Sequence, residues 1–190
     1  MKQGLNPTGR RFGAAARFVL ALLALLVVTA GTPEAETRAP AMAAPERLAD
    51  RVVVDKSARR LRLLRQGAVI AEYRVALGFE PDGHKRREGD GRTPEGLYQI
   101  SWRNPESAYH LSLFIDYPNP ADRAAAEARG EDPGGEIFIH GGSEEPGLFG
   151  WLSRLFRDDD WTAGCIAVTD AEMEEIWALT PTGVPIEIRP

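Results

Sequence analysis

Cysteine is almost absent from this chain: Cys165 is the only one in 190 residues. A disulfide within the chain is therefore excluded. One unpaired thiol leaves three alternatives, which are an intermolecular bridge, a small buried hydrophobic side chain and a reactive nucleophile. Composition alone slightly favours the buried side chain.

Histidine is also scarce, with only His84, His110 and His140 in the chain. One cysteine and three widely separated histidines form none of the close ligand pairs that a zinc site requires. We therefore expect no metal site.

Long apolar runs are missing except at Phe18–Ala30, where basic residues precede the run and small residues follow it. This order is typical of a signal peptide, and a membrane span needs about 20 apolar residues. We interpret residues 1–43 as a signal peptide, with an uncleaved N-terminal membrane anchor as the alternative, together with the start of a linker. The sequence thus predicts an exported protein of the periplasm or cell envelope, where cysteines are normally paired.

Basic residues are fewer than acidic ones, and the net charge is −5. Residues 1–43 contain five basic and two acidic residues, so their removal lowers the net charge to −8. An acidic domain argues against a polyanionic partner, and we expect no binding to nucleic acid.

The rest of the chain divides into a linker at 44–50 and one domain at 51–190. Gly, Pro and Asp separate mostly short apolar segments, which predicts a mostly β (α+β) fold: a β-sandwich or partly open barrel with a few short helices. We expect a three-stranded meander at Arg51–Gly78 and a loop at Glu80–Gly96. Further strands are expected at Leu97–Trp102, Tyr109–Tyr117, Glu136–Gly142 and Val184–Arg189, and helices at Pro120–Arg129 and Thr169–Leu179.

Two features between these elements remain open. Gly147–Phe156 has the pattern of an amphipathic surface helix or of a lid. Asp158–Asp160 is typical of a solvated acidic turn.

Cys165 lies four residues before Thr169, the expected N-cap of a helix. The positive end of a helix dipole lowers the pKa of a nearby thiol, and Gly164 permits a tight turn whose N–H groups can hold an oxyanion. A nucleophilic thiol also needs a base. His140 ends an apolar strand before two glycines and is the candidate partner. His84 is a solvated residue or a substrate contact.

Two segments resemble the signature of YkuD-type L,D-transpeptidase catalytic domains. They are IFIHGG (Ile137–Gly142) and TAGCIAVTD (Thr162–Asp170), which match a histidine–glycine pair, a spacer and then Ser/Thr-x-Gly-Cys. The blocks KSARRLRLL, GDGRTPEGLYQI and YHLSLFIDYPNPADR resemble the YafK-like branch of the same family. The resemblance covers Arg51–Arg189.

This resemblance implies a catalytic domain that acts on peptidoglycan stem peptides without a metal or cofactor. It implies that Cys165 is the nucleophile, that His140 transfers protons and that the carbonyl of Gly141 orients His140. The N–H groups of Gly164 and Cys165 are candidate oxyanion donors. Attack on the third residue of a stem tetrapeptide gives a thioester, which an amine of another stem or of an envelope protein resolves.

Substrate contacts are marked less clearly. Many family members carry Arg or Asn two residues after the cysteine, where this chain has Ala167. The missing polar contact must then come from elsewhere. His110, at the start of a strand, is either such a contact or a satisfied core residue. The candidate substrate contacts are Thr162, Trp161, Arg92, Lys85 and His110.

Three alternatives to a transpeptidase stay open. A hydrolase on the same scaffold would cut a diaminopimelate-linked protein–peptidoglycan amide or remove terminal D-alanine. A non-catalytic envelope-binding domain would bury its thiol. A sortase would need an arginine on a strand soon after the cysteine, and only Arg189 follows, near the end of the chain.

Overall fold

The computed structural model describes residues 39–142 and 160–190, and the compact unit begins at Arg38. Most of the proposed signal peptide, the Gly147–Phe156 segment, Asp158 and Asp159 lie outside the described residues. Within the described part of the chain, no helix is long and apolar enough to cross a membrane.

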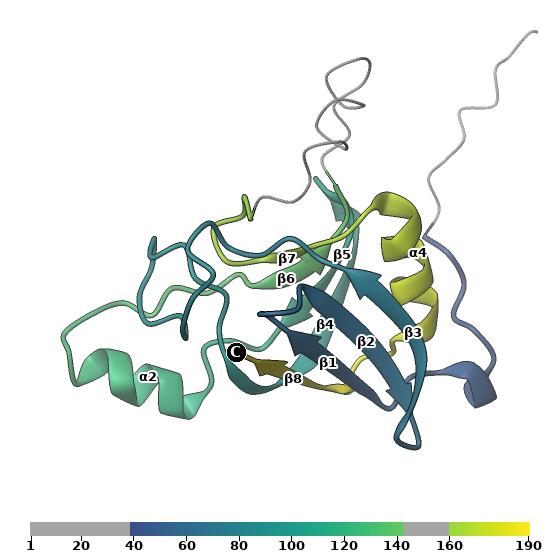
Figure 1. Cartoon of the computed structure of the whole chain (residues 1–190), viewed down its shortest axis with the longest axis horizontal. Helices are drawn as coiled ribbons and strands as arrows, with labels where there is room; N and C mark the ends of the chain where they lie inside the picture. The colour runs from purple at the N-terminus through teal and green to yellow at the C-terminus, as the bar shows by residue number, and fades with distance from the viewer. Residues whose placement is uncertain (1–38, 143–159) are drawn as a thin grey trace, which may run out of the picture. The chain divides into compact units, whose positions relative to one another are not determined.

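A single curled sheet of eight strands forms the described fold (Figure 1), in the order β3-β2-β1-β8-β4-β5-β6-β7. The mostly β class is confirmed, with two α-helices among the described residues. The strands are β1 (Arg51–Asp55), β2 (Arg60–Arg65), β3 (Ala68–Arg74), β4 (Gly96–Ser107), β5 (His110–Ile115), β6 (Phe138–His140), β7 (Ile166–Ala167) and β8 (Pro185–Arg189).

The expected meander forms from β1, β2 and β3, which pair antiparallel in chain order. Gln66 and Gly67 both have positive φ, at 51° and 80°, which suits a two-residue hairpin turn. The third strand ends at Arg74, before the end of the expected meander stretch at Gly78. Residues beyond it make isolated bridges from Ala76 to Ala167 and from Gly78 to Thr162. The meander is thereby attached to the segment that carries Cys165.

The last strand lies in the middle of the sheet. β8 pairs parallel with β1 and antiparallel with β4. It therefore joins the β1–β3 half of the sheet to the half that contains β4–β7. β4 and β5 form a hairpin, β6 pairs antiparallel with β5, and the two-residue β7 pairs parallel with β6. At this edge of the sheet, His140 at the end of β6 is in register with Ala167 at the end of β7.

Both predicted helices form, and both begin with a capping box. Asn119 caps α2 (Pro120–Glu127), and Thr169 caps α4 (Asp170–Leu179) with Glu172 as its reciprocal partner. The two helices lie at opposite ends of the sheet in Figure 1. α4 buries Met173, Ile176 and Trp177 against the sheet. Such a buried apolar stripe, together with the cap, fixes where the helix starts after the Cys165 segment.

Residues 39–49 lie against α4. A short 3-10 turn, η1 (Pro45–Arg47), divides the segment. The indole Nε1 of Trp177 donates to the Pro40 carbonyl at 3.1 Å, and the Ala49 N–H donates to the Leu179 carbonyl at 2.9 Å. Ala49 is buried and joins the core cluster.

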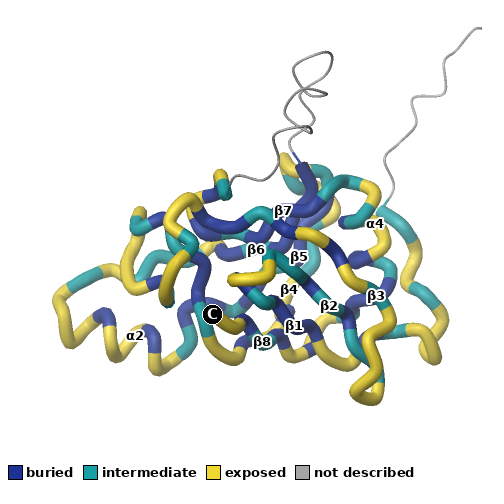
Figure 2. The backbone as a smooth tube through the Cα atoms, viewed as in Figure 1, coloured by how far each residue is buried: buried dark blue, intermediate teal, exposed yellow. Residues whose placement is uncertain are grey.

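The hydrophobic core lies inside the curl of the sheet. Figure 2 shows buried backbone along the central strands, whereas the β2–β3 turn and much of α2 are exposed. Leu61 and Leu63 alternate with more exposed residues along β2, as strand periodicity requires, whereas Val52, Val53 and Val54 of β1 are all buried. The rigid core thus supports β6 and β7, which carry the candidate site.

Candidate active site

The turn before Cys165 is held by the hydroxyl of Thr162. This hydroxyl accepts the Gly164 N–H at 3.1 Å and donates to the Cys165 carbonyl at 2.8 Å. Thr162 is buried, and both hydrogen bonds of its hydroxyl lie within the turn. Its hydroxyl therefore shapes the Thr-x-Gly-Cys turn, although the residue also lines the cleft described below.

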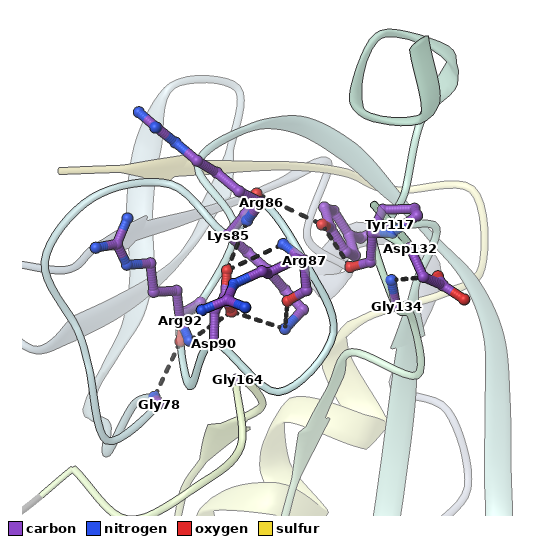
Figure 3. Close-up of polar contacts among 12 residues, drawn as sticks. Gly78, Lys85, Arg86, Arg87, Asp90, Arg92, Tyr117, Asp132, Gly134 and Gly164 are labelled. Atoms are coloured by element: carbon purple, nitrogen blue, oxygen red, sulfur yellow. Dashed lines mark hydrogen bonds and ion pairs between the residues drawn. The ribbon is translucent and has the colours of Figure 1, made fainter. Parts of the chain in front are cut away.

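Gly164 is required by the geometry of this turn. Its φ is +136°, and a Cβ built at this position would lie 2.6 Å from the carbonyl oxygen of Arg92. Only glycine adopts such a φ without strain, and the close backbone contact leaves no room for a methyl group. Figure 3 shows Gly164 next to the loop that carries Arg92.

The Cys165 thiol is half-buried and donates to the carbonyl of Glu136, with a sulfur–oxygen distance of 3.4 Å. Burial raises the pKa of the Cys165 thiol; the backbone N–H of Phe138 and the charge of Lys85 oppose this, and Glu136 adds to it. The sequence predicted a lowered pKa from the helix dipole, and this expectation is wrong in the resting structure. α4 begins only at Asp170, and burial is the largest influence on the pKa of the Cys165 thiol.

His140 ends β6 and is buried. Its Nδ1 lies 2.6 Å from the carbonyl oxygen of Gly141, which can only accept a hydrogen bond. Nδ1 therefore carries the proton in the neutral ring, and Nε2 holds a free electron pair. Burial lowers the pKa of His140, and the Gly141 carbonyl partly offsets this. Neutral imidazole is thus the resting form, which is the form a general base needs.

A cleft of about 400 Å³ joins Cys165 and His140. The ring of Tyr109 lies 4.6 Å from the imidazole, and the ring of Trp161 lies 5.8 Å from it in an edge-on arrangement. Trp161 is 45% exposed, so an aromatic face remains open to a ligand. Of the predicted substrate contacts, Trp161 and Thr162 line this cleft. Tyr109 was not predicted, because a tyrosine at a strand start gives no signal by itself.

Gly141 fits a position where no side chain is tolerated. A Cβ there would lie 2.5 Å from Oδ1 of Asp170 and 2.9 Å from the Tyr109 carbonyl. The same Asp170 oxygen accepts the Gly142 N–H at 2.8 Å. Asp170 thereby ties the segment after His140 to the first turn of α4, a role that the sequence did not indicate.

A second cleft, of about 590 Å³, lies on the other side of Cys165. Cys165, Ala163 and Glu136 line both clefts. Lys85, a predicted substrate contact, lines this second cleft together with Glu88, Asp132 and the glycines 89, 134 and 135. Cys165 therefore stands where two approaches from solvent meet.

Three residues that the sequence suggested as substrate contacts line neither of these two clefts. Arg92 places its carbonyl against Gly164, but it lines neither cleft. His110 pairs its Nε2 with Glu174 of α4 at 3.0 Å and is absent from both cleft walls. His84 accepts the Glu95 N–H on Nδ1 at 3.0 Å, so its Nε2–H faces the Asp122 carboxylate at 3.2 Å. Both histidines have structural partners.

Asp160 anchors the strand segment that leads to Trp161. Its carboxylate accepts two guanidinium bonds from Arg59, at 3.2 Å and 2.7 Å, and the N–H of Leu77 at 2.9 Å. Its side chain is only 11% exposed. The expectation of a solvated turn is therefore wrong for Asp160, because its charge is paired by an arginine far away in the sequence.

Among residues 39–142 and 160–190, no group of three or more His, Cys, Asp or Glu is placed to hold a metal ion. Ala167 is buried and exchanges two backbone hydrogen bonds with Ala76, each of 2.9 Å. The chemical groups gathered at the site are thus a thiol, an imidazole, backbone amides and one nearby ammonium.

Residues 49–188 match the model of the YkuD family, the L,D-transpeptidase catalytic domain. The chain belongs to this family. It is 33% identical over 115 residues to YafK of Escherichia coli, assigned as an L,D-transpeptidase; the match covers 59% of this chain. The chain spans just over a third of the length of that relative, 37%.

Two solved structures share the fold of this L,D-transpeptidase-family domain. The helical cell shape determining protein Pgp2 of Campylobacter jejuni is 26% identical with a TM-score of 0.54, over 73% of this chain and 46% of that one. Bd1075 of Bdellovibrio bacteriovorus is 21% identical with a TM-score of 0.51, over 80% of this chain and 52% of that one. The second likeness concerns the fold alone.

Proposed function

We propose that this domain is a peptidoglycan L,D-transpeptidase that works through a thioester on Cys165. The observation that carries the proposal is the shared cleft of Cys165 and His140, in which the Gly141 carbonyl leaves Nε2 of His140 free to take a proton. The family membership gives the reaction class. The thiol and the imidazole supply the nucleophile and the base.

In the first half-reaction, His140 Nε2 takes the thiol proton as Sγ attacks the carbonyl carbon of the diamino acid at stem position three. Burial favours the neutral forms of both residues, so the proton moves during attack and no ion pair is needed beforehand. The C–N bond then breaks, and Nε2–H gives its proton to the departing amine of D-alanine. A thioester on Cys165 remains.

In the second half-reaction, an acceptor amine attacks the thioester carbonyl. Its proton passes to His140, the C–S bond breaks, and the proton returns to the sulfur. Water in place of the amine would make the same site a hydrolase. The two half-reactions require that donor and acceptor both reach Cys165, which suits its place at the junction of two clefts.

The two clefts differ in character, which supports different occupants. The His140 cleft carries aromatic rings at Tyr109, Phe138 and Trp161, and we assign it to the donor stem. Besides Glu136, which lines both clefts, the Lys85 cleft carries carboxylates at Glu88 and Asp132, which attract a cationic amine. We therefore favour an amine acceptor, from a neighbouring stem or an envelope protein, over water.

The oxyanion requires backbone donors near the sulfur. The Gly164 N–H already donates to Thr162, so the N–H of Cys165 is the better candidate. Glycine at 164 keeps the turn tight enough for that N–H to face the reacting carbonyl, as in other acyl-transfer sites. The Gly164 N–H contributes indirectly, because it holds the turn in place.

The rival functions differ in what the thiol does. A non-catalytic domain would bury Cys165, whereas the thiol here is half-buried and lines two clefts. The envelope location, export through residues 1–43 and an N-terminal anchor are part of the same proposal, since peptidoglycan lies outside the cytoplasmic membrane.

The test is product analysis after incubating the domain with a tetrapeptide-bearing muropeptide, with and without an acceptor amine. We expect release of D-alanine and formation of a cross-linked product that depends on the acceptor. Cys165→Ala and His140→Gln should abolish both, and Glu131→Gln, a change after the end of α2 at a residue that lines neither cleft, should not. Free tripeptide as the sole product would mean a hydrolase, and unchanged substrate with folded protein would contradict the proposal.

A further inference from the structure

The domain buries two lysines, Lys56 and Lys85, each with only 3% of its side chain exposed. Lysine is rarely buried to this extent unless it is paired. Lys56 donates to the carbonyls of Gly83 and Thr93 and to the Glu95 carboxylate, at 2.6, 3.0 and 2.8 Å. An ammonium has three N–H groups, so all those of Lys56 are used inside the fold.

Lys85 is placed differently. It donates to Oδ1 of Asp90 at 3.0 Å and to the Arg87 carbonyl at 3.2 Å (Figure 3), and it lines the second cleft together with Cys165. Among the residues that the structure describes, these are its two acceptors. The third N–H of this ammonium is therefore not consumed by the loop that holds it.

The loop around Lys85 is organised by Asp90. Its Oδ2 accepts the N–H groups of Arg86 and Arg87 at 2.7 and 3.1 Å, and its Oδ1 accepts that of Arg92 at 3.1 Å. Burial raises the pKa of Asp90, but these three bonds and Lys85 outweigh it and lower the pKa. Asp90 is thus ionised and holds both the loop backbone and the ammonium.

This loop is also fixed relative to the Cys165 turn. The Arg92 carbonyl packs against Gly164, and Gly91 approaches Gly78 so closely that a Cβ on Gly78 would lie 2.1 Å from the Gly91 oxygen. On the opposite side, the Glu88 N–H donates to the Asp132 carbonyl at 2.8 Å. Figure 3 shows Lys85, Asp90 and Gly164 within this one cluster. The cation therefore cannot move away from the cleft without breaking several contacts.

We propose that Lys85 is a positioning residue for the nucleophile: held by Asp90 in the wall of the second cleft, its ammonium stabilises Cys165 when the sulfur becomes anionic. This role differs from that of a substrate contact, because the ammonium of Lys85 acts on the sulfur of Cys165 even when no substrate is bound. It rests on the proposed function only in that Cys165 is the nucleophile. Burial disfavours the thiolate, and the charge of Lys85 is the one side-chain cation that opposes this effect among the described residues.

The experiment measures the rate of Cys165 alkylation by iodoacetamide against pH, followed by intact mass, in the substrate-free domain. Because Cys165 is the only cysteine, the midpoint of this profile reports its thiol alone. In Lys85→Met we expect the midpoint to rise by about half a pH unit or more, since a cation held near a thiol lowers its pKa. Lys85→Arg, which keeps the charge, should restore most of the shift.

Lys56→Met is the matched control, because it removes an equally buried lysine that lines neither cleft. It should leave the midpoint unchanged. If Lys85→Met does not fold, Lys85→Gln keeps a donor for Asp90 without the charge and should show the same rise. An unchanged midpoint in a folded Lys85 variant, or an equal rise in Lys56→Met, would overturn the inference.

The outcome is independent of peptidoglycan chemistry. A shifted midpoint in a protein without acyl transfer would retain this inference and refute the proposed function. Normal acyl transfer by the unchanged domain, together with an unshifted alkylation midpoint in Lys85→Met, would support the proposed function and refute the role of Lys85.

Discussion

Replacing Gly164 with alanine tests how the Cys165 turn is held. The change places a methyl group 2.6 Å from the Arg92 carbonyl, at a φ of +136°. Backbone strain in this region costs about 1–3 kcal/mol, and overpacking a close contact costs about 1–3 kcal/mol more. We therefore expect the free energy of unfolding to fall by about 2–6 kcal/mol, with a severe loss of acyl transfer.

Gly183→Ala is the matched control. Gly183 also has a positive φ, of +86°, but a Cβ there meets nothing within 4 Å. Its cost should be about 1–2 kcal/mol, from the left-handed conformation alone. Urea denaturation with linear extrapolation measures both values. Equal losses in the two variants, or unchanged stability of Gly164→Ala, would refute the idea that the Arg92 contact dictates glycine at 164.

Three further predictions follow from the described contacts. Asp160→Asn leaves the half-buried Arg59 without its charge partner, so the free energy of unfolding should fall by about 2 kcal/mol. Glu131→Gln alters only the more exposed pair with Arg129 and should change the free energy of unfolding little; equal urea midpoints of the two variants would contradict this. Because burial lowers the pKa of His140, the unfolded chain binds a proton more readily than the folded one, and the free energy of unfolding should fall as the pH drops below about 6.5. His140→Gln should reduce that fall, and identical pH profiles of the two proteins would contradict this prediction. Deleting residues 1–50 should lower the thermal midpoint relative to deleting 1–38, because the former also removes Ala49 and the acceptor of the Trp177 indole; equal midpoints would show that this segment adds nothing.

Local signals in the sequence predicted the elements that depend on near neighbours. The alternation in β2, the Gln66-Gly67 turn and the Thr169–Glu172 capping box all involve residues a few positions apart. Such patterns express the chain's own periodicity and capping chemistry, and tertiary packing does not override them here. The Cys165 and His140 motifs were visible for the same reason, because each is a short contiguous segment.

Contacts between distant segments could not be predicted in this way. The insertion of β8 between β1 and β4 requires a parallel pairing across nearly the whole domain, which leaves no local pattern. The Asp160–Arg59 pair spans 101 positions in the chain. The pKa of Cys165 was predicted in the wrong direction because burial by the surrounding fold, which spacing cannot reveal, raises it.

The central claim is that Cys165 forms an acyl-enzyme. It is tested most directly by the intact mass of the domain during incubation with a tetrapeptide-bearing muropeptide and no acceptor. The account predicts an adduct equal to the donor minus D-alanine, located at Cys165, released by an added amine and absent in Cys165→Ala. A folded protein that consumes the donor without any adduct on Cys165, or equally well in Cys165→Ala, would contradict it.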